Sequence, residues 1–317
     1  REVVGVDMKV VDDSSLIAGD ILQPNASVIH ALGQARVVLC ALSNEVLSRA
    51  MDGLLAYTSP DCVLVDTLSI KSPFARVLAS SRDRLRSREI VGINPMFSGD
   101  LDPVGRPVAV VRYPGVVAGD ATRAFVDLLR GSGVHVVETE PEMHDRSMAA
   151  LQTLVHAGII AFGRVLGDEF QDIDTLLALA PPPFRVMLSL AARMTCNHPD
   201  VYWEIQRENP YAGEMRRLLI GTLNHLDAIC EVGDAKAFCE GMAQTAIRIV
   251  GPRPELVQLS RRIFGLLGQD IAVQRERFRG LVNDLEDRMP SGDLSDIRQR
   301  IDRLDDEIIE RLGARFR

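Results

Sequence analysis

The chain has 317 residues, enough for two ordinary domains, and its 46% apolar and 25% charged residues are typical of a globular protein with a sizeable core. A net charge of −8 argues against a general nucleic-acid or membrane-surface binder, although a local basic pocket remains compatible with it. The five cysteines, an odd number without paired metal spacing, indicate reduced thiols in a cytoplasmic protein, and no run of about 18 apolar residues predicts a membrane span.

Residues 1–138 alternate short apolar strands with helical stretches. Strands are predicted over residues 2–7, 35–42, 62–69, 89–95 and 107–113. Several of them lack polar alternation, as strands buried on both faces do, and helical segments such as 44–55 and 71–80 lie between some of them. This rhythm predicts a doubly wound, mostly parallel sheet.

From about residue 141 the pattern becomes helical. Long helices are predicted over 183–197, 211–230, 234–249 and 254–286. The predicted organisation is an α/β domain over 1–138, an all-α domain over 139–287, a linker at 288–293 and one amphipathic helix over 294–317.

Asp7 ends the first predicted strand. At the end of the second strand of a nucleotide-binding unit, an acid accepts hydrogen bonds from the adenosine ribose and repels the 2′-phosphate of NADP; a solvated strand-end acid is the alternative. A G-x-G-x-x-G loop after the preceding strand would decide between these two roles of Asp7, but the sequence does not contain one. If 2–7 is that second strand, we expect the loop to lie upstream of Arg1, in an N-terminal part missing from the sequence.

Asp66, Ser69 and Lys71 follow a buried strand. Ligands bind outside the carboxyl ends of strands in open α/β sheets, so Ser69 and Lys71 are placed to meet a cofactor or an anionic substrate. The alternative is that Ser69 caps the next helix and Lys71 lies in its exposed first turn.

Arg185 and Arg193 lie eight residues apart, a little over two helical turns, and therefore project from roughly the same side of one helix. Either both reach the surface, or they face an anionic ligand, for which arginine is suited. His156 lies in an apolar helix, where a histidine is more often a core residue. No histidine pattern predicts a catalytic metal.

Several stretches resemble the prephenate dehydrogenase family in order and spacing over residues 1–285. They are "VVLCALS", "VLVDTLSIKSP", "GINPMFSGD", "EMHDRSMAALQTLVHAGIIAFG", "PPFRVMLSLAARM" and "HPDVYWEIQRENP". The resemblance implies a Rossmann-like nucleotide-binding domain, a helical dimerisation domain, and oxidation of a cyclohexadienyl substrate at C4 with NAD(P) and loss of CO₂. It also implies a cytoplasmic homodimer. Asp7 favours NAD over NADP as the cofactor.

Site roles follow from the resemblance residue by residue. Arg193 matches the arginine that grips a substrate carboxylate, with Arg185 as its helix partner. Ser69 and Lys71 match residues beside the nicotinamide and the substrate. The further implied substrate-binding positions are Gln152, His156 and Tyr202, and the implied cofactor-binding positions are Asp7, Cys40, Ala41, Leu42 and Asp66.

The sequence departs from this family at Asn94. Family members typically carry His-Pro-Met there, and the histidine accepts the C4-hydroxyl proton as hydride leaves, whereas this chain carries Asn94-Pro95-Met96. Loss of a general base costs about 10²–10⁴ in rate. An amine at C4 removes that need, because the nitrogen lone pair stabilises the cation as an iminium and a neutral amide can still accept an N–H bond. Asn94 is therefore predicted to be catalytic, with 4-amino-4-deoxyprephenate as substrate and 4-aminophenylpyruvate as product.

The C-terminal stretch resembles the first helix of an AroQ-type chorismate mutase. Arg298 and Arg315 match its substrate-binding arginines, and a solvated amphipathic helix is the alternative. A fused mutase would catalyse the preceding step.

Two other functions remain open. One is a prephenate or arogenate dehydrogenase in which His156 or a water replaces the base. The other is a catalytically silent paralogue that binds the substrate and regulates a partner; the retained Ser69, Lys71, Arg185 and Arg193 argue against it.

Overall fold

A computed structural model describes residues 3–8, 16–85, 87–99, 101–170 and 172–267. The predicted linker and mutase-like helix, with Arg298 and Arg315, lie outside these residues. The chain forms two compact units, of which the first comprises residues up to Val155 together with Asp200–Arg216, and the second the remainder. The domain boundaries given from the sequence stay a prediction.

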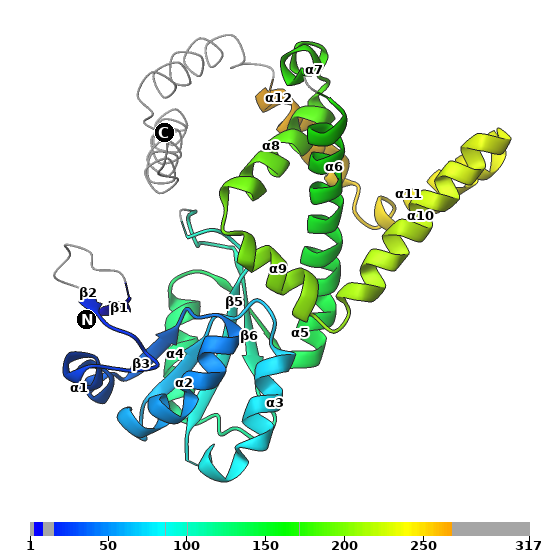
Figure 1. Cartoon of the computed structure of the whole chain (residues 1–317). Helices are drawn as coiled ribbons and strands as arrows, with labels where there is room; N and C mark the ends of the chain where they lie inside the picture. The colour runs from blue at the N-terminus through cyan, green and yellow to red at the C-terminus, as the bar shows by residue number, and fades with distance from the viewer. Residues whose placement is uncertain (1–2, 9–15, 86, 100, 171, 268–317) are drawn as a thin grey trace, which may run out of the picture. The chain divides into compact units, whose positions relative to one another are not determined.

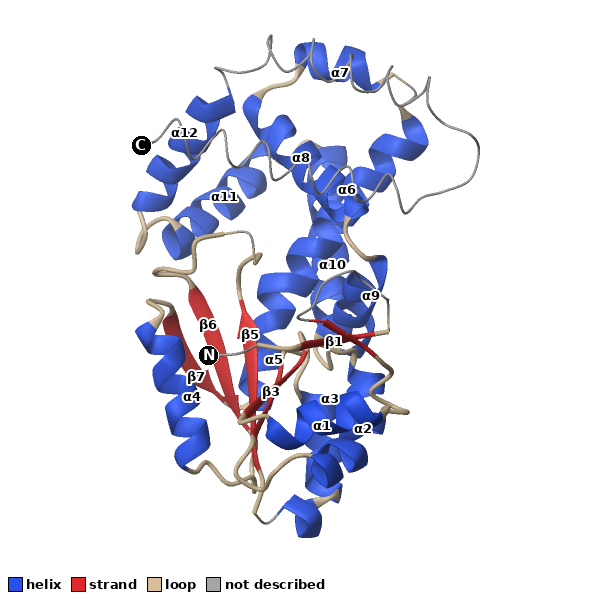
Figure 2. Cartoon of the chain, turned by 90° about the vertical axis from the view of Figure 1, so that its left-hand side faces the viewer, coloured by secondary structure: helices blue, strands red, loops and turns tan. Residues whose placement is uncertain are grey.

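The first unit is built on two sheets. Strands β1 (Gly5–Asp7) and β2 (Leu16–Ala18) form a parallel pair. The main sheet has the order β3-β4-β5-β6-β7, with bounds Val37–Cys40, Val63–Asp66, Glu89–Pro95, Pro107–Arg112 and His135–Thr139. Only the β5–β6 pair is antiparallel in this sheet, so the predicted mostly parallel sheet is confirmed (Figure 2).

Helices cover both faces of the main sheet. On one face, side chains of β4, β5 and β6 such as Leu64, Ile90 and Val111 pack with α1 (Ala26–Gln34), α2 (Asn44–Tyr57) and α3 (Ser72–Ser80). On the other face, the alternate residues, such as Val65, Val91 and Val110, pack against α4 (Asp120–Gly131). Burial on both faces explains the unbroken apolar runs of these strands. A 3₁₀ turn, Arg82–Leu85, follows α3.

A continuous helix connects the two units. It comprises α5 (Pro141–Met148), one π-helical segment, η2 (Ala149–Leu154), and α6 (Val155–Glu169) (Figure 1). Among the described residues, this helix alone is long and apolar enough to cross a membrane, with mean hydropathy 1.5 over its most apolar window. Core helices of soluble proteins pass the same test, and buried polar groups of α5 pack into the first unit.

The remaining helices complete the fold. They are α7 (Ile173–Leu179), α8 (Pro182–Cys196), α9 (Pro199–Glu208), α10 (Ala212–Val232), α11 (Ala235–Ile249) and α12 (Glu255–Leu267). Five of the helices predicted from the sequence agree with the observed ones to within two residues at each end. The sixth, predicted over 254–286, is described only as far as Leu267. All five cysteines are free.

Candidate active site

Strand β5 carries the centre of the candidate site. Gly92 and Asn94 are two residues apart, so their Cα–Cβ directions lie on the same face of the sheet, the face covered by α1–α3. Strand pairing places Asp66 of β4 beside Gly92 and Ala109 of β6 beside Asn94. This face of β5 therefore gathers polar groups from elements that are distant in the sequence.

Asp66, Lys71 and Tyr113 form a buried charged cluster beside Gly92. The Lys71 ammonium lies 2.5 Å from Asp66 Oδ1 and donates to the Ile93 carbonyl at 2.8 Å, while the Tyr113 hydroxyl donates to Asp66 Oδ2 at 2.8 Å. The Lys71 side chain is fully buried. Asp66 also accepts the Leu68 backbone N–H at 3.2 Å. Every charge in the cluster therefore has a partner, which a buried ion pair requires.

Burial dominates the ionisation of this cluster. It lowers the pKa of Lys71, and the adjacent Asp66 carboxylate opposes that shift. Burial and then Asp66 raise the pKa of Tyr113 well above 10, so its phenol stays protonated and donates. The Asp66 carboxylate is thus held by the Lys71 ammonium and the Tyr113 hydroxyl in the buried cluster.

Gly92 is required by this cluster. A Cβ there would lie 2.9 Å from Asp66 Oδ2, 3.0 Å from the Tyr113 hydroxyl and 3.1 Å from Lys71 Nζ. Gly92→Ala is therefore expected to lower the free energy of unfolding by about 1–3 kcal/mol, the usual cost of overpacking, measured by chemical denaturation. Gly99→Ala, whose Cβ would meet nothing within 4 Å, is the control. Equal stability of the two variants would contradict the requirement.

Asp145 of α5 links the continuous helix to the start of α3. Its carboxylate accepts the backbone N–H groups of Lys71 at 2.8 Å and Ser72 at 2.7 Å, and it therefore caps α3, which has no side-chain cap of its own. Burial acts to raise the pKa of Asp145, but hydrogen bonds from His144, Ser72 and Lys71 outweigh it and lower the pKa. Asp145 is consequently a carboxylate near neutral pH.

Asn94 joins this network through His144. His144 Nδ1 lies 2.8 Å from Asp145 Oδ1, and Asn94 Nδ2 lies 3.1 Å from His144 Nε2. The Asn94 amide nitrogen also lies 3.6 Å from Met148 Sδ, one helical turn along from His144. Only 5% of Asn94 is exposed, and His144 and Asp145 are fully buried. The predicted catalytic amide is thus held by groups of α5.

The π-helical segment η2 follows directly on these residues. Such segments are rare and frequently occur at functional sites. It carries Gln152, whose buried Oε1 has no hydrogen-bond partner among the described residues. Gln206 of α9 donates to the Thr153 carbonyl at 2.9 Å, which fixes α9, with the half-buried Tyr202, beside η2 in the first unit. Gln152 thus belongs to this segment, and Tyr202 belongs to the helix that is hydrogen-bonded to it.

Two of the predicted ligand-binding residues are paired with each other in the structure. Asp66 and Lys71 are each other's partners and are buried, so neither presents a free charge to a ligand. We expect them to position the loop that carries the half-buried Ser69. Their strand-end placement agrees with the prediction, but the missing Cβ at Gly92 leaves room for the ammonium to fold onto the sheet.

The second unit carries the other predicted substrate-binding residues. Arg185 donates to the Ala180 carbonyl at 3.1 Å and the Leu177 carbonyl at 2.7 Å, and so caps the end of α7. Arg193 is exposed, which matches the surface alternative for this side chain. His156 is half-buried, and burial lowers its pKa. Ligand roles for these three residues stay predictions.

Sequence reasoning missed His144, Asp145, Tyr113 and Gly92. His144 lies at the start of a helix, 50 residues from Asn94 in the sequence, and no role was predicted for it from the sequence. The adjacent His-Asp pair was the available signal, since an acid beside a histidine fixes the tautomer of its ring.

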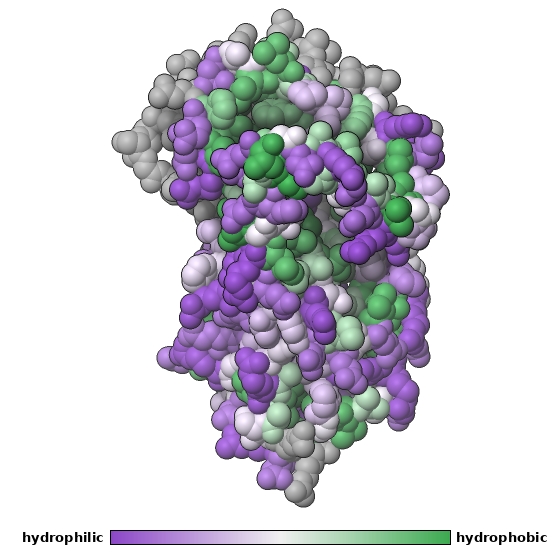
Figure 3. Space-filling model, turned by 90° about the vertical axis from the view of Figure 1, so that its right-hand side faces the viewer, coloured by the Kyte–Doolittle hydropathy of each residue, from purple (hydrophilic) through white to green (hydrophobic). Residues whose placement is uncertain are grey.

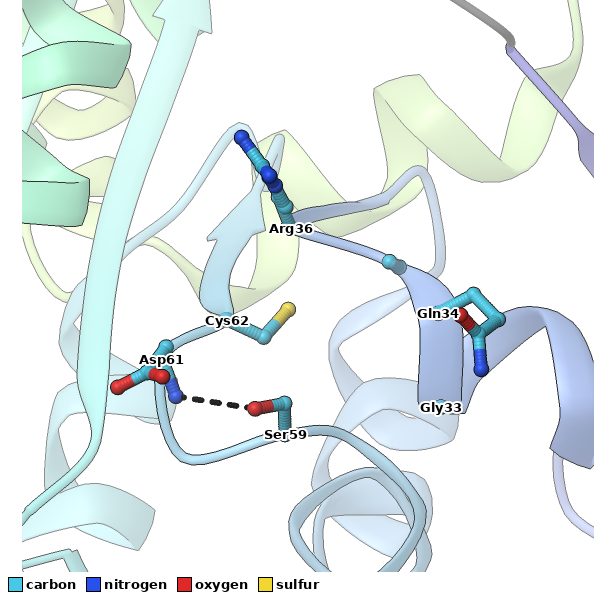
Figure 4. A pocket seen from close by; sticks show the side chains of 7 residues that line it. Gly33, Gln34, Arg36, Ser59, Asp61 and Cys62 are labelled. Atoms are coloured by element: carbon cyan, nitrogen blue, oxygen red, sulfur yellow. Dashed lines mark hydrogen bonds between the residues drawn. The ribbon is translucent and has the colours of Figure 1, made fainter.

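A pocket of about 210 Å³ lies away from this network, at the amino ends of β3 and β4 (Figure 4). Its lining includes Ser59, Asp61 and Cys62, and the Asp61 N–H donates to Ser59 Oγ at 3.3 Å. Ligands of open α/β sheets bind at the opposite ends of the strands, so we assign this pocket no role. In the part of the chain that the structure describes, no group of His, Cys, Asp or Glu side chains could hold a metal ion.

Comparisons with known proteins show which proteins this chain is similar to. A family model described as "Prephenate dehydrogenase, dimerization domain" matches residues 140–244. The chain is 37% identical to the 4-amino-4-deoxyprephenate dehydrogenase of Streptomyces pristinaespiralis over 81% of this chain and 84% of that protein. It is 24% identical to a probable arogenate/prephenate dehydrogenase of Methanocaldococcus jannaschii over 82% of this chain and 61% of that protein.

A solved structure shares the fold. The prephenate dehydrogenase from A. aeolicus, in complex with hydroxyphenyl propionate and NAD⁺, matches with a TM-score of 0.56 and 17% identity, covering 78% of this chain and 87% of that one. This likeness confirms the predicted fold class, a Rossmann-like domain followed by a helical domain.

Proposed function

The chain belongs to the prephenate dehydrogenase family, and on that premise we propose that it oxidises 4-amino-4-deoxyprephenate at C4 with NAD, releasing CO₂ and 4-aminophenylpyruvate. The family membership makes it an oxidoreductase acting on a cyclohexadienyl substrate. The finer assignment, an amine in place of a hydroxyl at C4, rests on one residue.

The single observation that carries the amine assignment is the surroundings of Asn94. Its amide nitrogen faces His144 and Met148, and no donor among the described residues reaches its carbonyl oxygen. A carbonyl can accept an N–H bond but cannot take up a proton near neutral pH. This suits a C4 amine, whose nitrogen lone pair stabilises the developing cation without prior loss of an O–H proton.

The residues present fit the NAD that the family implies. Asp7 ends β1 with an exposed carboxylate, suited to the ribose hydroxyls of an adenosine. Cys40, at the carboxyl end of β3, is followed by Ala41, Leu42 and the amino end of α2. Strand β3 lies at the edge of the main sheet, where a further parallel strand can pair with its backbone. When bound, NAD supplies the hydride acceptor.

An ordinary prephenate or arogenate dehydrogenase is the nearest alternative. His144 is the imidazole that comes closest to Asn94, but it is fully buried and both of its ring nitrogens are engaged. A general base must reach the proton that it removes. His144 does not meet that condition here, so this alternative depends on His156 or a water as the base.

The product distinguishes the two chemistries. Incubation of the full-length protein with 4-amino-4-deoxyprephenate and NAD is expected to yield 4-aminophenylpyruvate, CO₂ and NADH in equal amounts, measured by chromatography and absorbance. NADH formation without CO₂ would overturn the proposal.

Arg193 is proposed to grip a substrate carboxylate. Its guanidinium is exposed and has no hydrogen bond or ion pair among the described residues. Arg193→Ala is expected to raise KM about 100-fold with a smaller change in kcat, because a bidentate contact made in both ground and transition states is lost. Arg164→Ala, which removes an exposed arginine paired with Asp168, is the control. An unchanged KM in Arg193→Ala would contradict the role.

A homodimer through the helical domain is also proposed. Large apolar side chains are exposed on α10 and α11, among them Leu218, Ile220, Leu223, Met242 and Ile247, and hydrophobic side chains appear at the surface in Figure 3. Monomers rarely leave so much apolar surface uncovered.

Sedimentation is expected to show a dimer, and Leu223→Asp is expected to shift it toward monomer. An exposed polar position, Thr222→Asp, is the control. A wild-type monomer would contradict the interface.

We further propose a cytoplasmic location and a fusion to a mutase through the C-terminal stretch that resembles a mutase helix.

A further inference from the structure

We propose that His144 is a positioning residue that holds the Asn94 side chain with its carbonyl oxygen turned toward the C4 amine. The inference rests on the proposed function, because it explains how an amide selects that substituent. His144 does not contact the substrate in this account; it acts through Asn94.

Two acceptors on α5 determine which way the amide faces. An amide NH₂ group carries two donors, and His144 Nε2 and Met148 Sδ lie one helical turn apart at 3.1 Å and 3.6 Å from it. The planar amide then directs Oδ1 away from α5. Among the residues that the structure describes, no donor reaches this oxygen, so it remains available to an N–H of the substrate.

The His144 tautomer makes this arrangement possible. Asp145 is an ionised acceptor 2.8 Å from Nδ1, which places the ring proton on Nδ1 and leaves the lone pair on Nε2. An Nε2 that carried a proton would need an acceptor, and Asn94 would have to present its oxygen to α5. The tautomer of His144 therefore selects the group that Asn94 presents to the substrate.

Asp145 is itself rigidly held. Its side chain caps α3 through Lys71 and Ser72, and Asn209 donates to its backbone carbonyl at 2.8 Å. The carboxylate that sets the tautomer is therefore tied to the loop after β4. The positioning chain runs from the start of α3 through Asp145 and His144 to Asn94.

Two substitutions of His144 separate its two ring nitrogens. In His144→Asn the amide takes the place of Nδ1, so the link to Asp145 is kept and the acceptor for Asn94 is lost. In His144→Gln an amide oxygen takes the place of Nε2, so an acceptor for Asn94 is kept and the link to Asp145 is lost. His135→Asn, at an exposed histidine of β7, is the matched control.

We expect His144→Asn to lower kcat about 10- to 100-fold with little change in KM, because the carbonyl is no longer oriented. His144→Gln is expected to keep a kcat at least about tenfold above that of His144→Asn. In an Asn94→Ala background, His144→Asn should cause no further loss. Equal losses in both variants, or a loss that persists in Asn94→Ala, would overturn the proposal. This double-mutant cycle of Asn94 and His144 is measured with whichever of prephenate and 4-amino-4-deoxyprephenate the chain turns over.

A spectroscopic measurement decides the inference without turnover. The side-chain amide protons of Asn94 are assigned by their disappearance in Asn94→Ala. The NMR chemical shift of one of these protons is expected to lie downfield in the wild type. It is expected to move upfield in His144→Asn and to stay downfield in His144→Gln. No response to either substitution would overturn the positioning role, whereas inactivity with both substrates would overturn the proposed function alone.

Discussion

Asn94→His is expected to move the substrate preference from 4-amino-4-deoxyprephenate toward prephenate by about 10²–10⁴-fold in the ratio of kcat/KM, which is the usual worth of general base catalysis. Position 94 lies on the face of β5 that also carries Gly92, and its side chain reaches His144 and Met148. An imidazole placed there supplies a group that takes up the C4-hydroxyl proton. It also removes the neutral carbonyl that suits an amine.

Asn94→Ala is the matched control for this change. It removes the amide without adding a base, so turnover of the amine should fall and turnover of prephenate should not rise. Initial rates with both substrates measure the two effects. A preference that Asn94→His leaves unchanged would mean that position 94 does not select the substituent at C4.

Lys71→Met is expected to lower the free energy of unfolding by about 3–5 kcal/mol, the usual cost of removing one partner from a buried ion pair. The Lys71 ammonium is fully buried between Asp66 Oδ1 and the Ile93 carbonyl. Its removal leaves the Asp66 carboxylate buried with only Tyr113 and a backbone N–H as donors. Denaturant unfolding followed by circular dichroism measures the loss.

Two further variants test the reason for that loss. Tyr113→Phe removes one hydrogen bond from Asp66 and is expected to cost only about 1–3 kcal/mol. Adding Asp66→Asn to Lys71→Met is expected to recover part of the stability, because the uncompensated charge is gone. If Asp66→Asn lowers the free energy of unfolding by the same amount in the Lys71→Met background as in the wild type, the two groups do not interact.

Five strands of the first unit, β1 and β3–β6, and the helices α2 and α3 were predicted from local pattern, whereas β2, β7, α1 and α4 were not. Runs such as Val63–Asp66 are buried on both faces, and their unbroken apolar sequence records this directly. The start of α3 could not be predicted in the same way. Its cap comes from Asp145, 73 residues beyond Ser72, and only the folded chain brings the two together.

The sequence pointed to Asn94, Asp66 and Lys71 but not to the residues that contact them, such as His144 and Tyr113. Asn94 stands out because the family carries a base at that position. Lys71 was expected to face a ligand because it follows a strand, but the space above Gly92 takes its ammonium onto the sheet instead. Arg185 was predicted to be the helix partner of Arg193; in the structure it donates to two carbonyls at the end of α7, and its ligand role stays a prediction. A local sequence pattern does not determine which of several possible partners a long side chain contacts in the folded protein.

The most direct measurement is NADH formation by the full-length protein with prephenate and with 4-amino-4-deoxyprephenate, side by side at equal concentrations. The account predicts a kcat/KM for the amine at least about 100-fold above that for prephenate, as expected when a hydroxyl substrate lacks its base. A higher kcat/KM for prephenate would contradict the account and identify the chain as a prephenate dehydrogenase whose base lies elsewhere. Turnover of neither substrate, with binding intact, would contradict it in favour of a silent regulator.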